Sequence, residues 1–356
     1  MKFFNIDQHI SVIADVKHIF SRLGHTIDDW CLSGHAAVMG RRSDNDKVPM
    51  LADENWCAIS NDNRWDEFYD HYKADLDKYD GFIVTYPPQF AYLYEKFNKP
   101  IILQVPIRFD YGFHQHPKRV SKFLEYLASP NIRVCANSRF DQHYLQCFKP
   151  DLSVKYIPSL CEYTGMKYYP DNGMTSANTV LYYATKPFAE LPQNYQRREA
   201  ALPGGYSWQQ VAMFRAIVHF PYQVSTMSMF EQYTGCIPLF VPSIKFMLEL
   251  YIEGRVLEHY SNFLLWNHEP GSLIPFHEEK DPNAYDDLKA VEHWLQYADY
   301  YQKDMMPDVT TFDSFDEMQR KITNADLVDI SNTMARTNIT RKQMAYSEWE
   351  SVLGSI

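Results

Sequence analysis

The pattern of apolar and polar positions in the first half of the chain alternates between short apolar runs and amphipathic stretches. Short apolar runs predict buried strands, and apolar positions recurring every three or four residues predict helices. The expected strands are Lys2–Ile6, Thr26–Leu32, Gly81–Tyr86, Pro100–Pro106, Ile132–Ala136 and Val154–Pro158. The expected helices are Ser11–Leu23, Trp65–Lys78, Phe90–Asn98, Pro117–Leu127 and Phe140–Cys147. This alternation is typical of a parallel sheet covered by helices on both faces.

A second alternation begins after a less regular stretch, rich in Tyr, Pro and Gly, that extends from Pro158 to about Met174. Its expected strands are Thr179–Ala184, Ala216–Phe220, Ile237–Val241 and Asn262–Trp266. Its expected helices are Trp208–Met213, Met227–Tyr233 and Phe246–Glu253. The tail from Tyr285 is expected to be mostly helical and to end in an amphipathic segment over Thr340–Val352.

These patterns predict an α/β protein with two Rossmann-like domains. A chain of 356 residues is too long for one ordinary core. We expect an N-terminal domain over 1–158, a C-terminal domain over 159–338 and a final helical segment over 339–356. Ligands of open α/β sheets bind beyond the carboxyl ends of the strands, so the strand-to-helix loops are where chemistry is expected.

The composition narrows the class of protein. With 46% hydrophobic and 22% charged residues the chain is globular, and its net charge of −11 argues against a nucleic-acid partner. The sequence has no apolar run of about 18 residues and no signal peptide, so we expect a cytoplasmic protein without a transmembrane segment. The six cysteines are scattered and are expected to be reduced thiols: Cys31, Cys57, Cys135, Cys147, Cys161 and Cys236.

The segment Ala216–Ser243 has the most informative pattern, because a strand leads through Ser225 and Thr226 into a helix. A helix start with free N–H groups and a positive dipole end favours a phosphate or a diphosphate. Glu231 follows in the same helix, where a carboxylate can accept hydrogen bonds from the paired hydroxyls of a ribose. The alternative for Glu231 is a solvated carboxylate on a helix face.

The stretch FEQYTGCIPLFVPS resembles part of the Glu-x7-Glu motif of glycosyltransferases with the two-Rossmann (GT-B) architecture. Glu231 takes the position of the ribose-binding Glu and Pro238 that of the Pro that opens the next strand. Val224 stands where retaining members often carry another Glu, so the stereochemistry stays open. The stretches NIDQHISVIADVKHIFSRLGHTI, YDGFIVTYPPQFAYLYEKFNKPIILQV and VCANSRFDQHYL resemble the family more loosely.

The resemblance implies an enzyme that moves a hexosyl or pentosyl group from a nucleoside diphosphate sugar to a hydroxyl of a glycan or another acceptor. It also implies a C-terminal nucleotide-binding domain and a last helix that returns to the N-terminal domain. The candidate donor-binding residues are Lys186, Tyr222, Ser225, Thr226, Ser228 and Glu231. The serines and the threonine could equally be helix caps, and Lys186 could be a solvated surface lysine.

The N-terminal domain is expected to supply the base that takes the acceptor's proton. Asp7 and His9 directly follow the first strand, and Asp110 follows the strand IILQV. Asp7 could instead cap the first helix, and His9 could be a hydrogen-bonded supporting group. The candidates for binding phosphate or acceptor are Arg108, His114 and His35. A structural Arg108–Asp110 pair is as plausible as a functional one.

No metal or organic cofactor is expected. Asp44-Asn45-Asp46 matches the Asp-x-Asp pattern that holds a divalent ion in another glycosyltransferase class, but it lies in a polar loop without the expected preceding strand. The first strand is followed by no Gly-x-Gly-x-x-Gly, which argues against a dehydrogenase. Two other functions stay open: a sugar-nucleotide epimerase of the same fold and a non-catalytic nucleotide-sugar-binding protein.

Overall fold

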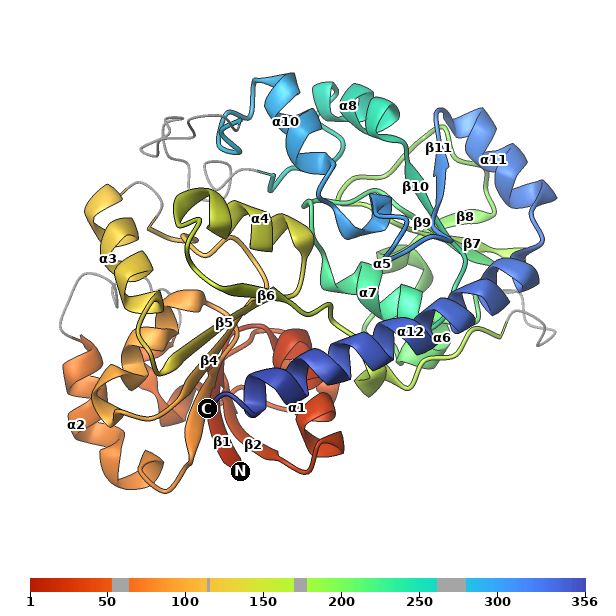
Figure 1. The fold of residues 1–356 in the computed structure, drawn as a ribbon. Coiled ribbons are helices and arrows are strands. Elements are labelled where there is room, and N and C mark those ends of the chain that lie inside the picture. The colour runs from red at the N-terminus through yellow and green to blue at the C-terminus, as the bar shows by residue number, and fades with distance from the viewer. Residues whose placement is uncertain (53–63, 114–115, 170–177, 261–279) are drawn as a thin grey trace. The chain divides into compact units, whose positions relative to one another are not determined.

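The computed structural model describes residues 1–52, 64–113, 116–169, 178–260 and 280–356 (Figure 1). These residues form two compact units. Unit 1 comprises the described part of Met1–Ser159 together with Met344–Ile356. Unit 2 comprises the described part of 160–260 together with 280–343. Each unit is built around one parallel sheet, so the expected pair of α/β, Rossmann-like units is confirmed.

Unit 1 contains a six-stranded parallel sheet in the order β2-β1-β3-β4-β5-β6. Its strands are β1 (Lys2–Asp7), β2 (Thr26–Cys31), β3 (Gly81–Val84), β4 (Ile101–Val105), β5 (Ile132–Ala136) and β6 (Val154–Tyr156). The α-helices are α1 (Ile10–Arg22), α2 (Arg64–Leu76), α3 (Pro117–Leu127) and α4 (Arg139–Phe148). The 3-10 helices are η1 (Ala36–Met39), η2 (Asn45–Lys47), η3 (Pro49–Leu51) and η5 (Pro88–Phe97).

Unit 2 contains a five-stranded parallel sheet in the order β11-β10-β9-β7-β8. Its strands are β7 (Val180–Tyr183), β8 (Tyr195–Arg197), β9 (Ala216–His219), β10 (Leu239–Pro242) and β11 (Thr310–Phe312). The α-helices are α5 (Arg198–Ala201), α6 (Trp208–Val211), α7 (Met227–Thr234), α8 (Ile244–Ile252), α10 (Leu288–Leu295) and α11 (Phe315–Asn324). The 3-10 helices are η6 (Glu162–Thr164) and η8 (Asp299–Tyr301).

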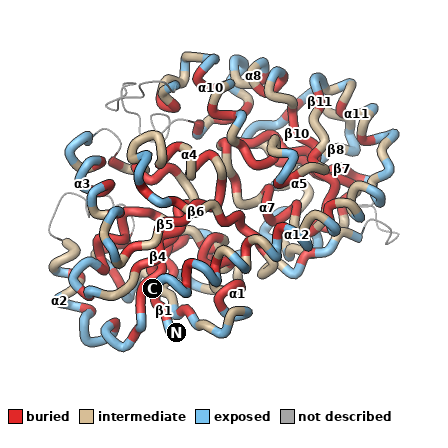
Figure 2. Tube along the Cα trace, viewed as in Figure 1, coloured by how far each residue is buried: buried red, intermediate tan, exposed pale blue. Residues whose placement is uncertain are grey.

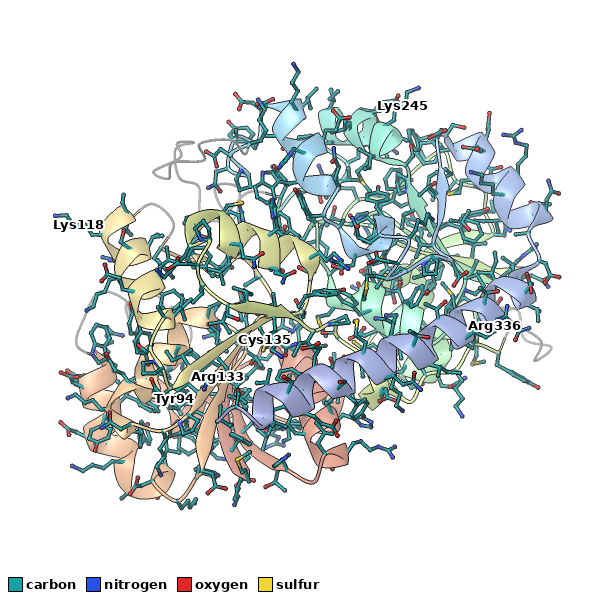
Figure 3. The ribbon with its side chains drawn as sticks, in the orientation of Figure 1. Tyr94, Lys118, Arg133, Cys135, Lys245 and Arg336 are labelled. Atoms are coloured by element: carbon teal, nitrogen blue, oxygen red, sulfur yellow. The ribbon has the colours of Figure 1, made fainter. Side chains whose placement is uncertain are left out.

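The central strands are buried along their whole length, as Figure 2 shows. Their sequences, such as GFIV in β3 and AIVH in β9, are apolar on both faces because helices cover both sides of a parallel sheet. Tyr94 in η5 and Cys135 in β5 are buried within unit 1, whereas Lys118, Lys245 and Arg336 extend into solvent (Figure 3). The core of each unit therefore lies along its parallel sheet, and the same sheet positions the strand-to-helix loops of that unit.

Serine residues start several helices by satisfying backbone N–H groups that have no partner within the helix. Ser138 accepts a hydrogen bond from the backbone N–H of Asp141 at 3.0 Å, and its hydroxyl donates to the Asp141 carboxylate at 2.6 Å. Ser243 caps α8 through the N–H of Phe246, and Ser314 caps α11. These caps fix where the strand-to-helix loops end.

Several short elements differ from the sequence expectation, among them strands β8 and β11 and the helix near Phe90. Strands β8 and β11 were not expected, because each has three residues at a sheet edge and little apolar content. The helix expected over Phe90–Asn98 is a 3-10 helix that begins at Pro88 and ends before Asn98, whose φ is 52°. The strand expected over Asn262–Trp266 lies outside the described residues.

The last helix, α12 (Leu327–Leu353), is longer than the expected Thr340–Val352 segment. The buried residues Met334, Arg341, Ala345, Trp349 and Val352 recur at helical spacing along one face, and Leu353 is buried at the end of the helix. Residues from Met344 onward belong to unit 1, where the Trp349 ring lies edge-on to Phe20 with centroids 5.2 Å apart. The chain thus returns to the first unit through α12, as the resemblance implies.

The described cysteines Cys31, Cys135, Cys147, Cys161 and Cys236 are free thiols, and Cys57 lies outside the described residues. Burial raises the pKa of Cys135 to about 12 and that of Cys31 to about 11. Both thiols therefore stay protonated, which suits core packing better than nucleophilic chemistry. Within the described residues, no helix has the length and apolar character needed to cross a membrane.

Candidate active site

The strand order reverses at one point in each sheet, and this point is where ligands of doubly wound sheets bind. In unit 1 the reversal lies between β1 and β3, and in unit 2 between β7 and β9. All strands of a unit run parallel, so these neighbours place their carboxyl ends at the same edge. The residues that end these strands therefore define two candidate sites, one in each unit.

The unit 2 site begins with Tyr183 at the end of β7 and His219 at the end of β9. Their rings stack with centroids 5.1 Å apart and an interplanar angle of 11°. The His219 Nε2 lies 3.0 Å from the hydroxyl of Ser228, while its Nδ1 is buried without a hydrogen-bond partner among the described residues. Burial, assisted by the nearby charge of Arg198, lowers the pKa of His219 to about 3, so its imidazole is neutral.

A cation joins this site from Arg198, which directly follows β8. The Arg198 guanidinium lies 5.2 Å from the centroid of the Tyr183 ring, a cation–π distance. Burial raises the pKa of Tyr206, and the positive charge of Arg198 acts in the opposite direction. Arg198 was missed in the sequence because β8 is too short to give a pattern. An Arg placed at the carboxyl edge of this sheet can bind a phosphate group.

The predicted helix start is present: Thr226 precedes α7 with an extended backbone, φ −140° and ψ 134°. Its side chain does not cap the helix, and its Oγ1 is buried without a hydrogen-bond partner among the described residues. Ser225 is half-buried in the preceding loop. The start of α7 thus combines the positive end of the helix dipole with a hydroxyl that caps no helix and has no hydrogen-bond partner among the described residues.

Glu231 lies one turn into α7 and is 6% exposed, so it is not the solvated carboxylate of the alternative interpretation. Its Oε1 accepts a hydrogen bond of 2.5 Å from the hydroxyl of Tyr163 in η6. The charge of Glu231 also acts on the hydroxyls of Tyr183 and Tyr222. A buried carboxylate surrounded by hydroxyls is suited to accept further hydrogen bonds from a diol.

The other predicted donor residues are more exposed. Lys186 lies in the loop after β7 and donates a hydrogen bond of 2.7 Å to the carbonyl of Gly254. The Tyr222 ring lies edge-on to His259 with centroids 5.5 Å apart. The charges of both Arg198 and Glu231 act on the Tyr222 hydroxyl, which groups Tyr222 with the cluster at the end of β9. No such interaction groups Lys186 with this cluster in the described part of the chain.

The unit 1 site contains a buried polar chain that ends at Asp7. The Asn5 amide donates to the Ile83 carbonyl at 2.9 Å and to the Thr85 hydroxyl at 3.3 Å, and Thr85 donates to Asp7 Oδ1 at 2.8 Å. Asp7 Oδ2 is buried without a hydrogen-bond partner among the described residues. Burial raises the pKa of Asp7 to about 8, against the opposing hydrogen bond from Thr85. The side chain is a protonated acid at neutral pH, and it does not cap α1.

His9 precedes α1 at the same edge without a side-chain capping bond. Burial, with the charge of His35 adding to it, lowers the pKa of His9 to about 4. Its Nδ1 is buried without a hydrogen-bond partner in the described structure, and its ring lies edge-on to Tyr86 at 5.9 Å. His35 is exposed at the start of η1. His9 is thus a neutral imidazole that can accept a proton at pH 7.

The cluster after β4 is also buried. Asp110 is fully buried and accepts a hydrogen bond of 2.7 Å from the hydroxyl of Tyr144 in α4. Arg108 is 2% exposed, and its guanidinium lies 5.5 Å from the centroid of the same Tyr144 ring. Tyr144 therefore links both predicted residues. The predicted His114 lies outside the described residues.

The Asp-x-Asp stretch holds a loop together. One carboxylate oxygen of Asp44 accepts from the backbone N–H of Cys31 at 2.9 Å and from Arg41 at 3.2 Å. The other oxygen lies 2.8 Å from the ammonium of Lys47, and Asp46 is exposed in η2. Among the described residues there is no group of three or more His, Cys, Asp or Glu side chains that could hold a metal ion.

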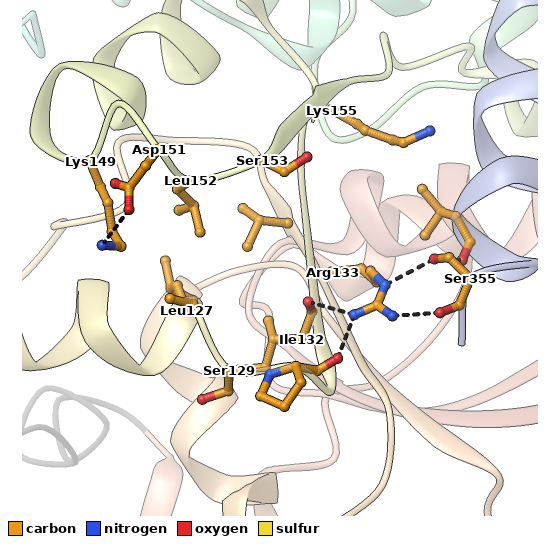
Figure 4. Close-up of a pocket in the computed structure, with 14 residues that line it drawn as sticks. Leu127, Ser129, Ile132, Arg133, Lys149, Asp151, Leu152, Ser153, Lys155 and Ser355 are labelled. Carbon is orange, nitrogen blue, oxygen red and sulfur yellow. Dashed lines mark hydrogen bonds and ion pairs between the residues drawn. The ribbon is translucent and has the colours of Figure 1, made fainter.

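A hollow of about 480 Å³ lies at the opposite, amino edge of the unit 1 sheet, between the ends of α3 and α4 and the end of α12 (Figure 4). Its cation Arg133 donates to the carbonyls of Pro130, Ile132 and Ser355. Lys155 pairs with Glu348 at 2.9 Å. Arg133 thus satisfies carbonyl groups near the ends of α3 and α12, which is a structural role.

No protein-family model matches the chain, and no curated protein matches it in sequence. Solved structures do match its fold. The spinosyn rhamnosyltransferase SpnG is 11% identical, with 95% of this chain and 96% of that chain covered and a TM-score of 0.43.

The glycotransferase of kitacinnamycin is 11% identical, with 98% of both chains covered and a TM-score of 0.43. The glycosyltransferase SnogD from Streptomyces nogalater is 10% identical, with 99% and 98% covered and a TM-score of 0.42. Likenesses with TM-scores this low do not establish a function, which depends on the side chains of the site.

Proposed function

We propose that the chain is a glycosyltransferase that moves a sugar from a nucleoside diphosphate sugar to a hydroxyl of a glycan or another acceptor, without a metal ion. The observation that carries this proposal is the grouping of Arg198, His219 and Glu231 at the point where the unit 2 strand order reverses. The cation suits the diphosphate and the buried carboxylate suits the ribose hydroxyls, while the neutral imidazole holds the Ser228 hydroxyl beside them.

In this proposal the nucleoside diphosphate binds to unit 2. The start of α7 and the Arg198 guanidinium stabilise the diphosphate, both in the substrate and as the leaving group. The Ser228 hydroxyl, held by His219 at 3.0 Å, supplies a further hydrogen bond. Glu231 accepts hydrogen bonds from the ribose hydroxyls. Ser225, Thr226 and Tyr222 line the same region, and Lys186 is a less favoured phosphate ligand because it already binds Gly254.

Unit 1 supplies the base. His9 is favoured because its imidazole is neutral at pH 7 and its Nδ1 is buried without a hydrogen-bond partner among the described residues, whereas Asp7, with its pKa raised to about 8, is mostly protonated there. Asp7 instead supports the loop that carries His9 through the hydrogen bond from Thr85 and the buried chain behind it. Asp110 is a second candidate base, and Arg108 and His35 are candidates for binding the acceptor.

A nucleotide-sugar panel tests the proposal. The protein is incubated with the UDP, dTDP, GDP and CDP forms of common sugars, with and without simple glycan acceptors, and the released diphosphate is measured. Release that rises with acceptor supports a transferase. An altered donor sugar without transfer would indicate an epimerase, binding without turnover would indicate a binding protein, and no binding of any nucleotide would overturn the proposal.

Glu231 provides the residue-level test. Glu231→Ala removes the carboxylate that accepts from the ribose, so nucleotide affinity should fall about 100-fold, the loss expected for two hydrogen bonds to a charged group. The control is Glu249→Ala, which removes an exposed carboxylate from α8. Calorimetric titration measures both variants, and unchanged affinity in Glu231→Ala would contradict the assigned role.

A further inference from the structure

We infer that Tyr163 is a positioning residue for nucleotide binding, because its hydroxyl holds Glu231 in the orientation that receives the ribose. The inference rests on the proposed function and extends it to the segment that follows unit 1 in the chain. The contact that supports it is the 2.5 Å hydrogen bond from the Tyr163 hydroxyl to Glu231 Oε1. A donor this close fixes one oxygen and with it the plane of the whole carboxylate.

The position of Tyr163 is itself fixed by the local backbone. Tyr163 lies in the single turn η6 between Cys161, with φ 51°, and Gly165, with φ 58°. The Thr164 hydroxyl donates to the Cys161 carbonyl at 3.0 Å and accepts from the N–H of Met166 at 3.2 Å. These short-range hydrogen bonds close the turn. They fix the backbone at Tyr163 and therefore the direction in which its side chain leaves the turn.

The same segment follows α7 beyond Glu231. The N–H of Tyr168 donates to the Gly235 carbonyl at 2.9 Å, and Met166 packs so closely on Gly235 that an added Cβ would lie 2.9 Å from its Cε. Glu162 pairs with Lys342 of α12. The segment is therefore held to α7 at several points, and Tyr163 cannot move away from Glu231 without breaking other contacts.

The Tyr163 ring has a packing role that is separate from its hydroxyl. Its ring lies edge-on to Trp208, with centroids 6.0 Å apart and an angle of 86°. Trp208 in turn lies edge-on to Tyr206 at 6.1 Å. Tyr163→Phe keeps this ring packing and removes only the donor, so the substitution isolates the hydrogen bond to Glu231.

A positioning role predicts a specific change in recognition. Glu231 acts on the ribose hydroxyls, so its contribution is measured by the ratio of Kd values for a 3′-deoxynucleoside diphosphate and its parent. In the unchanged protein, where Tyr163 holds Glu231 in place, the Kd of the 3′-deoxy compound should be much larger than that of its parent. In Tyr163→Phe the carboxylate can rotate, the parent's Kd rises about tenfold, as for the loss of one hydrogen bond to a charged group, and the ratio falls toward one.

The experiment uses the full chain, with UDP, dTDP, GDP and CDP as probes, followed by the 3′-deoxy form of the one that binds most tightly. Titration calorimetry gives the Kd values and thermal unfolding reports stability. The matched control is Tyr168→Phe, which removes another hydroxyl of the same segment, one that donates to the Arg215 carbonyl at 2.6 Å. Tyr168→Phe should leave the 3′-deoxy ratio unchanged.

A double variant separates positioning from general destabilisation. Tyr163→Phe added to Glu231→Gln should cause little further loss of affinity, because the group that Tyr163 positions is already impaired. The inference is overturned if Tyr163→Phe leaves the ratio unchanged, or if Tyr168→Phe lowers it equally. If the unchanged chain binds none of the four probes, the proposed function fails, and the inference fails with it.

Discussion

The two units share one strand plan but differ in the chemistry at its reversal point. When the strands of each sheet are numbered in chain order, both sheets have the spatial order 2-1-3-4-5, and the unit 1 sheet continues with a sixth strand. Unit 2 places a cation, Arg198, beside the neutral His219 and the buried Glu231. Unit 1 places the protonated Asp7 near a neutral histidine, His9. The same edge is thus suited to binding an anion in one unit and to taking up a proton in the other.

This contrast has a physical cause. In unit 1 the buried carboxyl groups of Asp7 and Asp110 each accept a hydrogen bond from a hydroxyl, that of Thr85 and that of Tyr144 respectively. Burial raises the pKa of Asp7 more than the Thr85 hydrogen bond and the charge of Arg41 lower it, so the neutral acid is favoured. In unit 2 the half-buried Arg198 supplies a positive charge at the sheet edge. Burial and the nearest ionisable neighbours therefore decide together what each edge can do, while the strand order decides where the edge lies.

The largest effect is expected at His9. His9→Ala removes the proposed base, so the transfer rate should fall by roughly 100- to 10,000-fold, the usual contribution of general base catalysis. Nucleotide affinity should stay unchanged, since His9 belongs to unit 1 and the donor site to unit 2. Steady-state kinetics and calorimetry measure the two properties. An equal loss of rate and affinity would contradict the assignment of the base to unit 1 and of nucleotide binding to unit 2.

The next effect concerns stability and pH at Asp7. Its folded pKa of about 8 lies above the ordinary value of 3.8, so the unfolded chain loses this proton at lower pH than the folded chain does. The Asp7 contribution therefore lowers the free energy of unfolding as pH rises from about 4 to 8.

Asp7→Asn keeps the shape of the protonated acid and removes this loss, so it should stabilise the protein by up to a few kcal/mol at pH 8 and very little at pH 4. Thermal unfolding across this pH range tests the prediction. If the unfolding temperatures of the unchanged protein and of Asp7→Asn shift in parallel with pH, Asp7 is ionised in the folded state and the prediction is wrong.

A smaller effect is expected at Arg198. Arg198→Ala should weaken the binding of a nucleoside diphosphate about 10- to 100-fold, because one charge-assisted contact is lost, and should leave the binding of the free nucleoside nearly unchanged. Lys186→Ala is the comparison, since Lys186 is exposed and bound to Gly254. Calorimetry with UDP and uridine, or the best-binding pair, tests this. A greater loss in Lys186→Ala would move the phosphate site to the loop after β7.

No effect is expected from a chelator. Asp44 already binds the Cys31 N–H, Arg41 and Lys47, so it is poorly placed to hold a divalent ion. Transfer measured with and without EDTA should therefore proceed at the same rate. If EDTA abolishes activity and added magnesium restores it, Asp44 and Asp46 become candidate ligands of a divalent ion.

Much of the fold follows from local pattern. Continuous apolar runs such as GFIV and IILQV identify central strands, and serines such as Ser138 and Ser243 mark helix starts. The edge strands β8 and β11 could not be predicted, because three residues on a half-exposed edge carry too little hydrophobic periodicity. The segment around Glu231 was identifiable because its Ser/Thr helix start, its carboxylate and its Gly and Pro lie close together in sequence.

The sequence by itself determined the α/β class, the positions of the main strands and the candidates Asp7, His9 and Glu231, because these depend on near neighbours in the chain. Only the tertiary structure decided that Arg198 lies on Tyr183, that Tyr163 holds Glu231 and that Asp7 is buried with Thr85. These pairs are 15, 68 and 78 residues apart. Contacts at such separations depend on strand order and burial, which no local pattern encodes.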